Sequence, residues 1–136
     1  MDGFVLLFIA GLKTTIMLAL VSGALGMVVG LLAAAAKLSR FKPLAFVVGV
    51  YTTVVRGVPE LLIILLIYFG GTIAISSFFG RYVEINAFSA GVLALTIVFG
   101  AYTAEIFRGA VLSISRGQIE AARSLGLHPW QIWLLI

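Results

Sequence analysis

Long uncharged and mostly apolar runs alternate with short charged segments along the chain. Three of the runs are long: Thr14–Ala36, Leu61–Gly80 and Ile85–Ala104. At about 1.5 Å rise per residue, a helix of about 20 residues reaches about 30 Å, which is the thickness of the hydrocarbon core of a bilayer. The pattern therefore predicts three membrane-spanning helices, over approximately residues 14–36, 60–80 and 86–107.

Two apolar runs are too short to cross a membrane. Pro43–Val55 predicts an interfacial or buried helix, and Gly3–Leu12 predicts a surface helix that leads into the first span. Together with the three spans, these segments predict an all-α integral membrane protein for residues 1–136.

Composition supports a membrane protein over a soluble one. Of the 136 residues, 62% are hydrophobic and 10% are charged, and the mean hydropathy is +1.23. Soluble domains carry about 25% charged residues, so a soluble enzyme is disfavoured. The net charge is +4, but the basic residues flank apolar runs, so nucleic-acid binding is disfavoured as well. The chain has no cysteine, which excludes disulfides and cysteine-based metal sites.

The distribution of basic residues predicts the orientation in the membrane. Seven of the nine lie at span ends that would share one side, namely Lys37, Arg40, Lys42, Arg56, Arg108, Arg116 and Arg123. Cytoplasmic loops carry the excess of Lys and Arg. We therefore expect that side to be cytoplasmic, the N-terminus to lie outside, and residues 81–86 to form an outer loop.

Glycines indicate where helices pack or bend. Gly26 and Gly30 form a GxxxG pattern, extended by Ala34, which allows close approach of another helix. That helix could belong to the same chain or to another subunit. The Gly70-Gly71 pair either bends the second span or marks its outer end.

Four polar residues near span ends are candidates for a substrate path. Arg56 and Glu60 flank Pro59 at a helix start, and they either only begin the helix or take part in gating or subunit contact. Tyr102 and Glu105 share a face of the third span at i, i+3. Glu105 either pairs with Arg108 or lines a translocation route, because carboxylates within membranes usually face a partner or a water-filled path.

The segment after the third span predicts a helical hairpin. Gly117 and Gly126 bracket one short helix, and Pro129 suits the start of a second helix. The apolar positions of the second helix are helically spaced and comprise Ile132, Leu135 and Ile136. The small side chains of Ala121 and Ala122 would allow close docking of a partner. His128 is expected to be a helix-start or surface residue.

Several segments together resemble a known family. Glu120-Ala121-Ala122, Gly126 and Ile136 have the spacing of the Glu-Ala-Ala (EAA) loop of permease subunits in ATP-binding-cassette importers. The segments Tyr51-Thr52-Thr53, 56–61, Tyr68-Phe69-Gly70, 100–110 and 117–126 resemble the polar amino-acid branch, with members handling histidine, arginine, lysine, ornithine or opines. These segments span most of residues 13–136.

The resemblance implies a subunit with five spans and an outside N-terminus. It also implies that residues 116–136 form a coupling loop that fits into an ATPase subunit, with the coupling positions Gly117, Glu120, Ala121, Ala122 and Gly126. The family motif continues past Ile136 into two further spans, so we expect the chain to be a fragment or a truncated protein.

The function implied is import of polar, and by local sequence basic, amino acids across the bacterial cytoplasmic membrane by alternating access. The partners implied are ATPase subunits carrying ATP and Mg²⁺, a second permease subunit, an external amino-acid-binding protein and membrane lipid. The sequence has no nucleophile–base pair, phosphate loop or metal cluster, so we expect no catalytic residue, metal or cofactor on this chain. A non-transporting membrane scaffold or a small channel subunit is the alternative.

Overall fold

The structure is a computed structural model that describes residues 2–135, so Ile136 at the end of the predicted coupling loop lies outside the described residues. All of the regular secondary structure is helical, with no strand between residues 2 and 135. Its elements are α1 (Asp2–Leu38), α2 (Lys42–Gly57), α3 (Glu60–Leu65), the π-helical turn η1 (Leu66–Gly70), α4 (Gly71–Phe79), α5 (Ala87–Ser113), α6 (Arg116–Ser124) and α7 (Pro129–Leu135).

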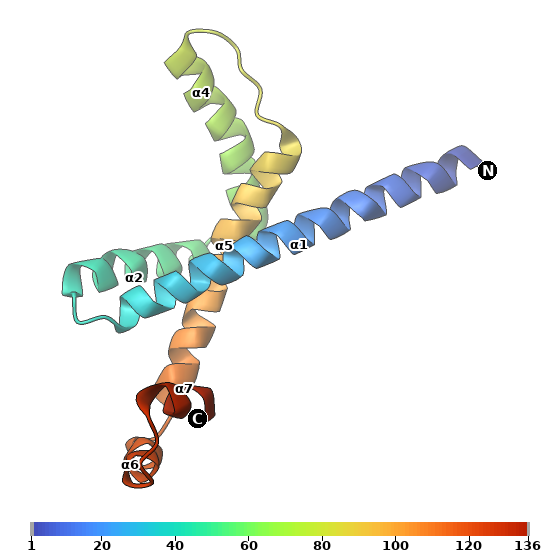
Figure 1. The fold of residues 1–136 in the computed structure, drawn as a ribbon. Helices are drawn as coiled ribbons and strands as arrows, with labels where there is room; N and C mark the ends of the chain where they lie inside the picture. Colours follow the sequence, from blue (N-terminus) through green and yellow to red (C-terminus); the bar gives the residue numbers. More distant parts are fainter. Residues whose placement is uncertain (1, 136) are drawn as a thin grey trace.

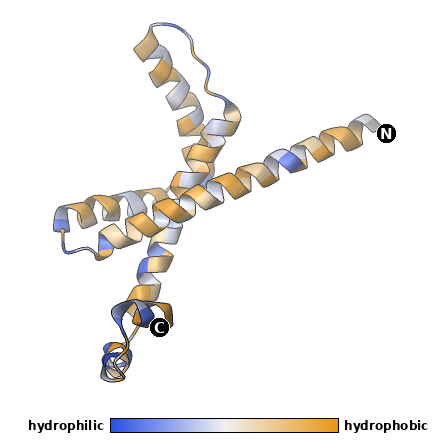
Figure 2. Ribbon diagram, in the orientation of Figure 1, coloured by the Kyte–Doolittle hydropathy of each residue, from blue (hydrophilic) through white to orange (hydrophobic). Residues whose placement is uncertain are grey.

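Three helical stretches are long and apolar enough to cross a membrane. They are Gly3–Leu38, Glu60–Phe79 and Ala87–Ser113. Hydrophobic residues dominate these stretches, whereas hydrophilic residues gather on α6 and in the connections before α2 and α5 (Figure 2). The predicted architecture of three spans with additional short helices is confirmed.

The prediction of a separate surface helix over Gly3–Leu12 is wrong. α1 runs without a break from Asp2 to Leu38, and the hydroxyl groups of Thr14 and Thr15 donate to the carbonyls four residues earlier, both at 3.0 Å. The single charge of Lys13 does not interrupt a helix, because lysine is a good helix former. At about 1.5 Å per residue, α1 is about 55 Å long and exceeds the hydrocarbon core, so it has to tilt or extend beyond it.

α1 and α5 cross each other (Figure 1), and the two glycines of the GxxxG pattern lie in their contact. A Cβ atom on Gly26 would lie 2.7 Å from Phe99 Cδ1, and one on Gly30 would lie 2.5 Å from Thr103 Cβ and 3.1 Å from the Ala104 amide nitrogen. Glycine thus lets the two backbones approach closely, as small residues do between membrane helices. The glycine pattern packs against a helix of the same chain.

The second span is irregular at its middle. The Gly70-Gly71 pair does not end the helix, which continues through α4 to Phe79 and stops at Gly80, whose φ is +63°. Instead, the π-helical turn of η1 ends at Gly70. A Cβ on Gly71 would lie 2.7 Å from Ile85 Cδ1, so this glycine makes room for the outer loop.

The predicted short helix is α2, which lies beside the C-terminal half of α1 (Figure 1). Its Tyr51 hydroxyl donates to the Ile97 carbonyl of α5 at 2.6 Å. Thr52 is the largest of the fully buried side chains, with 1% exposure. α2 is therefore fastened to α5 as well as to α1, and these three helices form the packed centre of the described chain.

Candidate functional site

The helix α6 begins with a capping box that the glycine pattern did not reveal. The Ser115 hydroxyl accepts from the Gln118 amide at 3.3 Å, and the Gln118 side chain accepts from the Ser115 amide at 3.2 Å. Two backbone donors at the helix start are thereby satisfied. The sequence signal was present, since serine followed three residues later by glutamine marks a helix start. Gly117 consequently lies inside α6 and does not bracket it.

The end of α6 is set by Gly126, as predicted. Its φ is +75°, a left-handed conformation that glycine adopts without steric cost. The Gly126 amide donates to the Arg123 carbonyl at 2.9 Å, and the Leu127 amide donates to the Ala122 carbonyl at 3.2 Å. This pair of bonds is the Schellman motif, and it turns the chain sharply toward α7.

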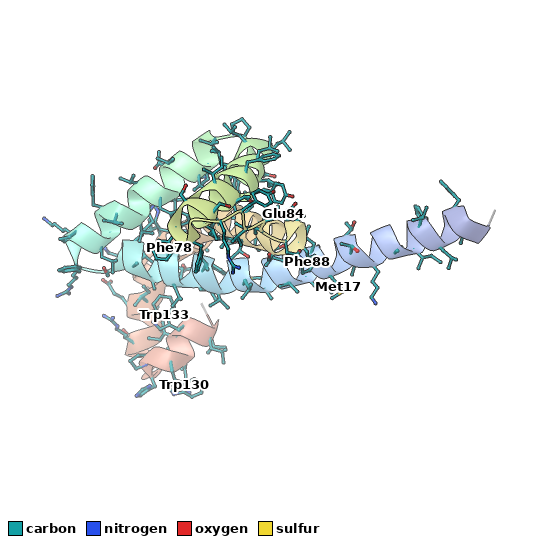
Figure 3. The ribbon with its side chains drawn as sticks, turned by 90° about the horizontal axis from the view of Figure 1, so that it is seen from above. Met17, Phe78, Glu84, Phe88, Trp130 and Trp133 are labelled. Atoms are coloured by element: carbon teal, nitrogen blue, oxygen red, sulfur yellow. The ribbon has the colours of Figure 1, made fainter. Side chains whose placement is uncertain are left out.

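The helix α7 then folds back beside α6. The His128 amide donates to Gln131 Oε1 at 2.8 Å, so His128 stands at the helix start, as predicted. Ile132 is buried and faces a mainly apolar groove of about 470 Å³, whose lining also includes Val111, Ile119 and Trp133. Figure 3 places Trp130 and Trp133 on this hairpin, apart from Glu84 in the outer loop. The hairpin of α6 and α7 thus forms a distinct unit at the end of α5.

The five predicted coupling positions differ in accessibility. Gly117, Glu120, Ala121 and Gly126 are exposed on α6 and its turn. Ala122 is 5% exposed and packs inward, so its small side chain serves contact within the hairpin and does not widen an outer docking face. α6 therefore presents one polar face bearing Glu120 and a second, buried face bearing Ala122.

Two of the four substrate-path candidates line a common groove. Glu60 at the start of α3 and Tyr102 of α5 both border a cavity of about 550 Å³, which is walled by α1 and α5. The Arg56 guanidinium lies 5.5 Å from the centre of the Tyr102 ring, a cation–π distance. Arg56, Glu60 and Tyr102 are thus brought together although 46 residues of sequence separate the outer two.

Glu105, the fourth candidate, lies in a separate cluster and not in this groove. Arg108 Nε donates to Glu105 Oε2 at 3.1 Å, which is the local pairing that the sequence suggested. Lys37 of α1 also forms an ion pair with Glu105, and Thr52 Oγ1 donates to Glu105 Oε1 at 2.9 Å. These two partners were missed, because nothing in the local pattern links residues on three different helices.

The described residues contain no group of three or more His, Cys, Asp or Glu side chains that could hold a metal ion. The α6–α7 hairpin and the groove at Glu60 and Tyr102 offer a partner charged groups, hydrogen-bonding groups and a shaped surface.

Comparison with known proteins identifies the family. Residues 26–136 match the family described as "Binding-protein-dependent transport system inner membrane component". The chain belongs to this family. The match includes α6, α7, the groove residues of α3 and α5, and the whole Glu105 cluster.

Relatives of the chain include permeases of amino-acid transport systems. The chain is 50% identical over 126 residues to the nopaline transport system permease protein NocQ of Agrobacterium fabrum, covering 88% of the chain and 53% of NocQ. It is 40% identical over 128 residues to the arginine ABC transporter permease protein ArtQ of Haemophilus influenzae, covering 93% of the chain and 56% of ArtQ. The chain therefore spans about half the length of the curated relatives that it matches.

A solved structure shares the fold. It is the crystal structure of an amino acid ABC transporter with histidines, which the chain matches with a TM-score of 0.79 and 41% identity, over 97% of this chain and 58% of that one. The arrangement of α1 to α7 is therefore that of a portion of an amino-acid transporter permease.

The capping box of α6 gives a first test. Ser115→Ala should cost about 1 kcal/mol of local α6 stability, because the Gln118 amide loses the hydroxyl that accepts its hydrogen bond. Amides of the first turn of α6 should then exchange about fivefold faster in hydrogen–deuterium exchange. Ser124→Ala is the matched control, since the Ser124 hydroxyl only bonds back to the Glu120 carbonyl. Equal exchange in the two variants would contradict the cap's role.

Proposed function

We propose that this chain is part of the permease subunit of an ATP-binding-cassette importer for polar amino acids. The single observation that carries the proposal is the compact α6–α7 hairpin, held by a capping box and a Schellman motif at the end of a membrane-spanning helix. Family membership over residues 26–136 supports it. Only Ile114 and Ser115 lie between α5 and α6, so the hairpin follows the end of α5 directly.

In this proposal α6 is the coupling helix. Its exposed residues Gly117, Glu120, Ala121 and Gly126 seat in a groove of a soluble ATPase subunit on the cytoplasmic side. The ATPase subunits carry ATP and Mg²⁺, and ATP closes their dimer. Its movement shifts α6, then α5, and so switches the spans between outward- and inward-facing states. This chain contributes a binding surface and transmits the movement, and ATP is hydrolysed on the partner ATPase.

The excess of basic residues at the α6 end supports an orientation with the N-terminus outside. A multi-pass subunit in the bacterial cytoplasmic membrane would then receive its amino acid at the outer side from a binding protein. A second permease subunit, identical or homologous, would complete the pathway. Labelling of an introduced cysteine at Ala121 tests this topology directly, because the 136 residues contain no other cysteine. Reaction with an impermeant reagent added outside intact cells would overturn it.

The groove between Glu60 and Tyr102 is the proposed substrate contact on this chain. Glu60 forms no ion pair with a described residue, so its carboxylate is available to an ammonium or guanidinium group. The lining residues Leu95, Val98 and Phe99 are apolar and suit the aliphatic stem of a long basic side chain. Basic amino acids are thus the substrate class that the groove favours.

Uptake by the complete permease, reconstituted in proteoliposomes with its ATPase and binding protein, tests the proposal as a whole. ATP-dependent accumulation of labelled arginine, competed by lysine and histidine, is the expected result. A complex that assembles without an ATPase, or that never accumulates any amino acid, would leave a scaffold or channel as the function.

A variant in the groove tests the substrate contact. Glu60→Gln should raise KM for arginine uptake about tenfold, because a hydrogen bond to a charged group is worth about 1.5–3 kcal/mol, while uptake of glutamine should stay within about twofold. Glu84→Gln is the matched control, since Glu84 accepts from the Tyr68 hydroxyl at 2.9 Å in the outer loop. Unchanged arginine KM in Glu60→Gln would remove Glu60 from the substrate path.

A further inference from the structure

The Lys37–Thr52–Glu105 cluster has no role in the groove or in the α6 docking face, yet it joins three helices. Lys37 Nζ donates to Thr52 Oγ1 at 2.9 Å and to the carboxylate of Glu105. The side chains of Lys37 and Glu105 are only 14% and 17% exposed. A charged pair this far from solvent requires partners on both sides, and here the partners come from α1, α2 and α5.

The cluster lies beyond the point where α1 and α5 cross, and there it can hold the angle between these two helices. α1 and α5 touch at Gly26 and Gly30, and past this point they diverge toward the α6 end of the molecule (Figure 1). Their contact runs from Leu18 against Gly91 to Gly30 against Thr103, and beyond it the spacing of the two helix ends depends on other contacts. The Lys37 side chain spans the opening beyond the crossing and holds Glu105, so it provides a second point of attachment. Two attachment points fix the crossing angle.

Thr52 adds the third helix to this connection. Its hydroxyl lies between Lys37 and Glu105 and is fully enclosed, and Tyr51 in the same turn of α2 is bonded to the Ile97 carbonyl of α5. α2 therefore braces the open side of the angle between α1 and α5. Arg108 belongs to α5 itself and moves with Glu105, so it balances charge without linking helices.

We propose that Lys37 is a positioning residue for energy coupling: through Glu105 and Thr52 it locks α1, α2 and α5 into one body that moves with α6. The inference rests on the proposed importer function. Because α5 passes into α6 through only two residues, a displacement of α6 reaches Glu105 within about two helical turns of the end of α5. With the Lys37–Glu105 ion pair in place, α1 follows this displacement. Without this ion pair, the displacement changes the angle between α1 and α5, and α1 does not follow.

The first test measures the angle and does not depend on transport. Spin labels are placed at Arg40→Cys beyond α1 and at Leu112→Cys near the end of α5, both exposed positions, in the complete permease complex freed of other cysteines. The distance distribution should be narrow with Lys37 present and about twofold broader with Lys37→Met. Lys37→Arg, which keeps the charge and the donors, should restore the narrow distribution. An equally narrow distribution in Lys37→Met would overturn the proposal.

The second test measures coupling. In proteoliposomes of the complete complex, Lys37→Met should lower amino-acid uptake per ATP hydrolysed about tenfold, with Lys37→Arg within about twofold of the original. Lys42→Met is the matched control, because Lys42 is exposed at the same end of the molecule and forms no ion pair with a described residue. If the unmodified complex shows no ATP-dependent uptake, the importer function fails. If the unmodified complex transports and Lys37→Met transports with the same yield per ATP, only the proposed role of Lys37 fails.

Discussion

We expect Gly30→Leu to destabilise the complete permease strongly or to prevent its assembly. In the structure a Cβ at this position would stand 2.5 Å from Thr103 Cβ and 3.1 Å from the Ala104 amide nitrogen. The Ala104 atom is backbone and cannot rotate away, so α1 and α5 have to separate to admit a leucine. Overpacking a well-packed contact costs about 1–3 kcal/mol and occasionally more, and here it also breaks the contact that places α2. The expected cost is at the upper end of that range.

The measurement is the midpoint of heat-induced loss of the monodisperse peak in detergent, for the complete permease with its partner subunits. Gly30→Leu should lower this midpoint by roughly 10 °C or prevent recovery of the complex, as a loss of about 3 kcal/mol implies. Gly11→Leu is the matched control on the same helix, because no atom lies within 4 Å of a Cβ there. A midpoint for Gly30→Leu equal to that of Gly11→Leu would show that close approach of α1 and α5 is dispensable.

The second large effect concerns the turn after α6. Gly126→Val should assemble normally and yet lose coupling, with uptake per ATP hydrolysed lowered at least about tenfold. No atom lies within 4 Å of a Cβ on Gly126, so crowding is not the reason. The reason is the φ of +75°, which costs a β-branched residue more than the roughly 1–2 kcal/mol of other L-residues. The Schellman bonds then open and α6 loses its fixed angle to α7.

Gly126→Asn separates backbone strain from loss of glycine itself. Asparagine visits the left-handed region far more readily than valine, so this variant should keep coupling within about threefold of the original. Both variants remove the same glycine and both project a side chain into open space. If Gly126→Asn were as uncoupled as Gly126→Val, the docking of α6 would depend on the absence of any side chain at this position and not on the turn.

Much of the fold could be predicted from the chain itself, and the misses have physical causes. The span over residues 14–36 was predicted correctly in kind, but its N-terminal extension was not, because a single lysine in an apolar helix reads as a boundary when it is only a solvated side chain. The capping box is encoded in four consecutive residues from Ser115 to Gln118, and it, not Gly117, marks the start of α6. The GxxxG pattern indicated close packing without saying which helix it meets.

The candidate sites divide in the same way. Gly126 predicts a turn and Pro129 predicts a helix start, because glycine and proline have strong backbone preferences of their own. The joining of Glu60 with Tyr102 in one groove, and the separation of Tyr102 from Glu105, depend on how α3 approaches α5. Spacing along one helix suggested a shared face for Tyr102 and Glu105. In the structure Glu105 instead contacts Lys37 of α1 and Thr52 of α2.

The sequence by itself determined that this chain belongs in a membrane, how many of its helices are long and apolar enough to cross it, and where the terminal hairpin turns. Those properties follow from the hydrophobicity of runs and from the conformational limits of single residues, which act locally. Only the tertiary structure decided that Gly30 meets Thr103, that Ala122 faces inward and that Lys37 holds Glu105 across 68 residues of sequence. Such pairings are set by the crossing of α1 and α5, and a crossing angle arises from many contacts at once.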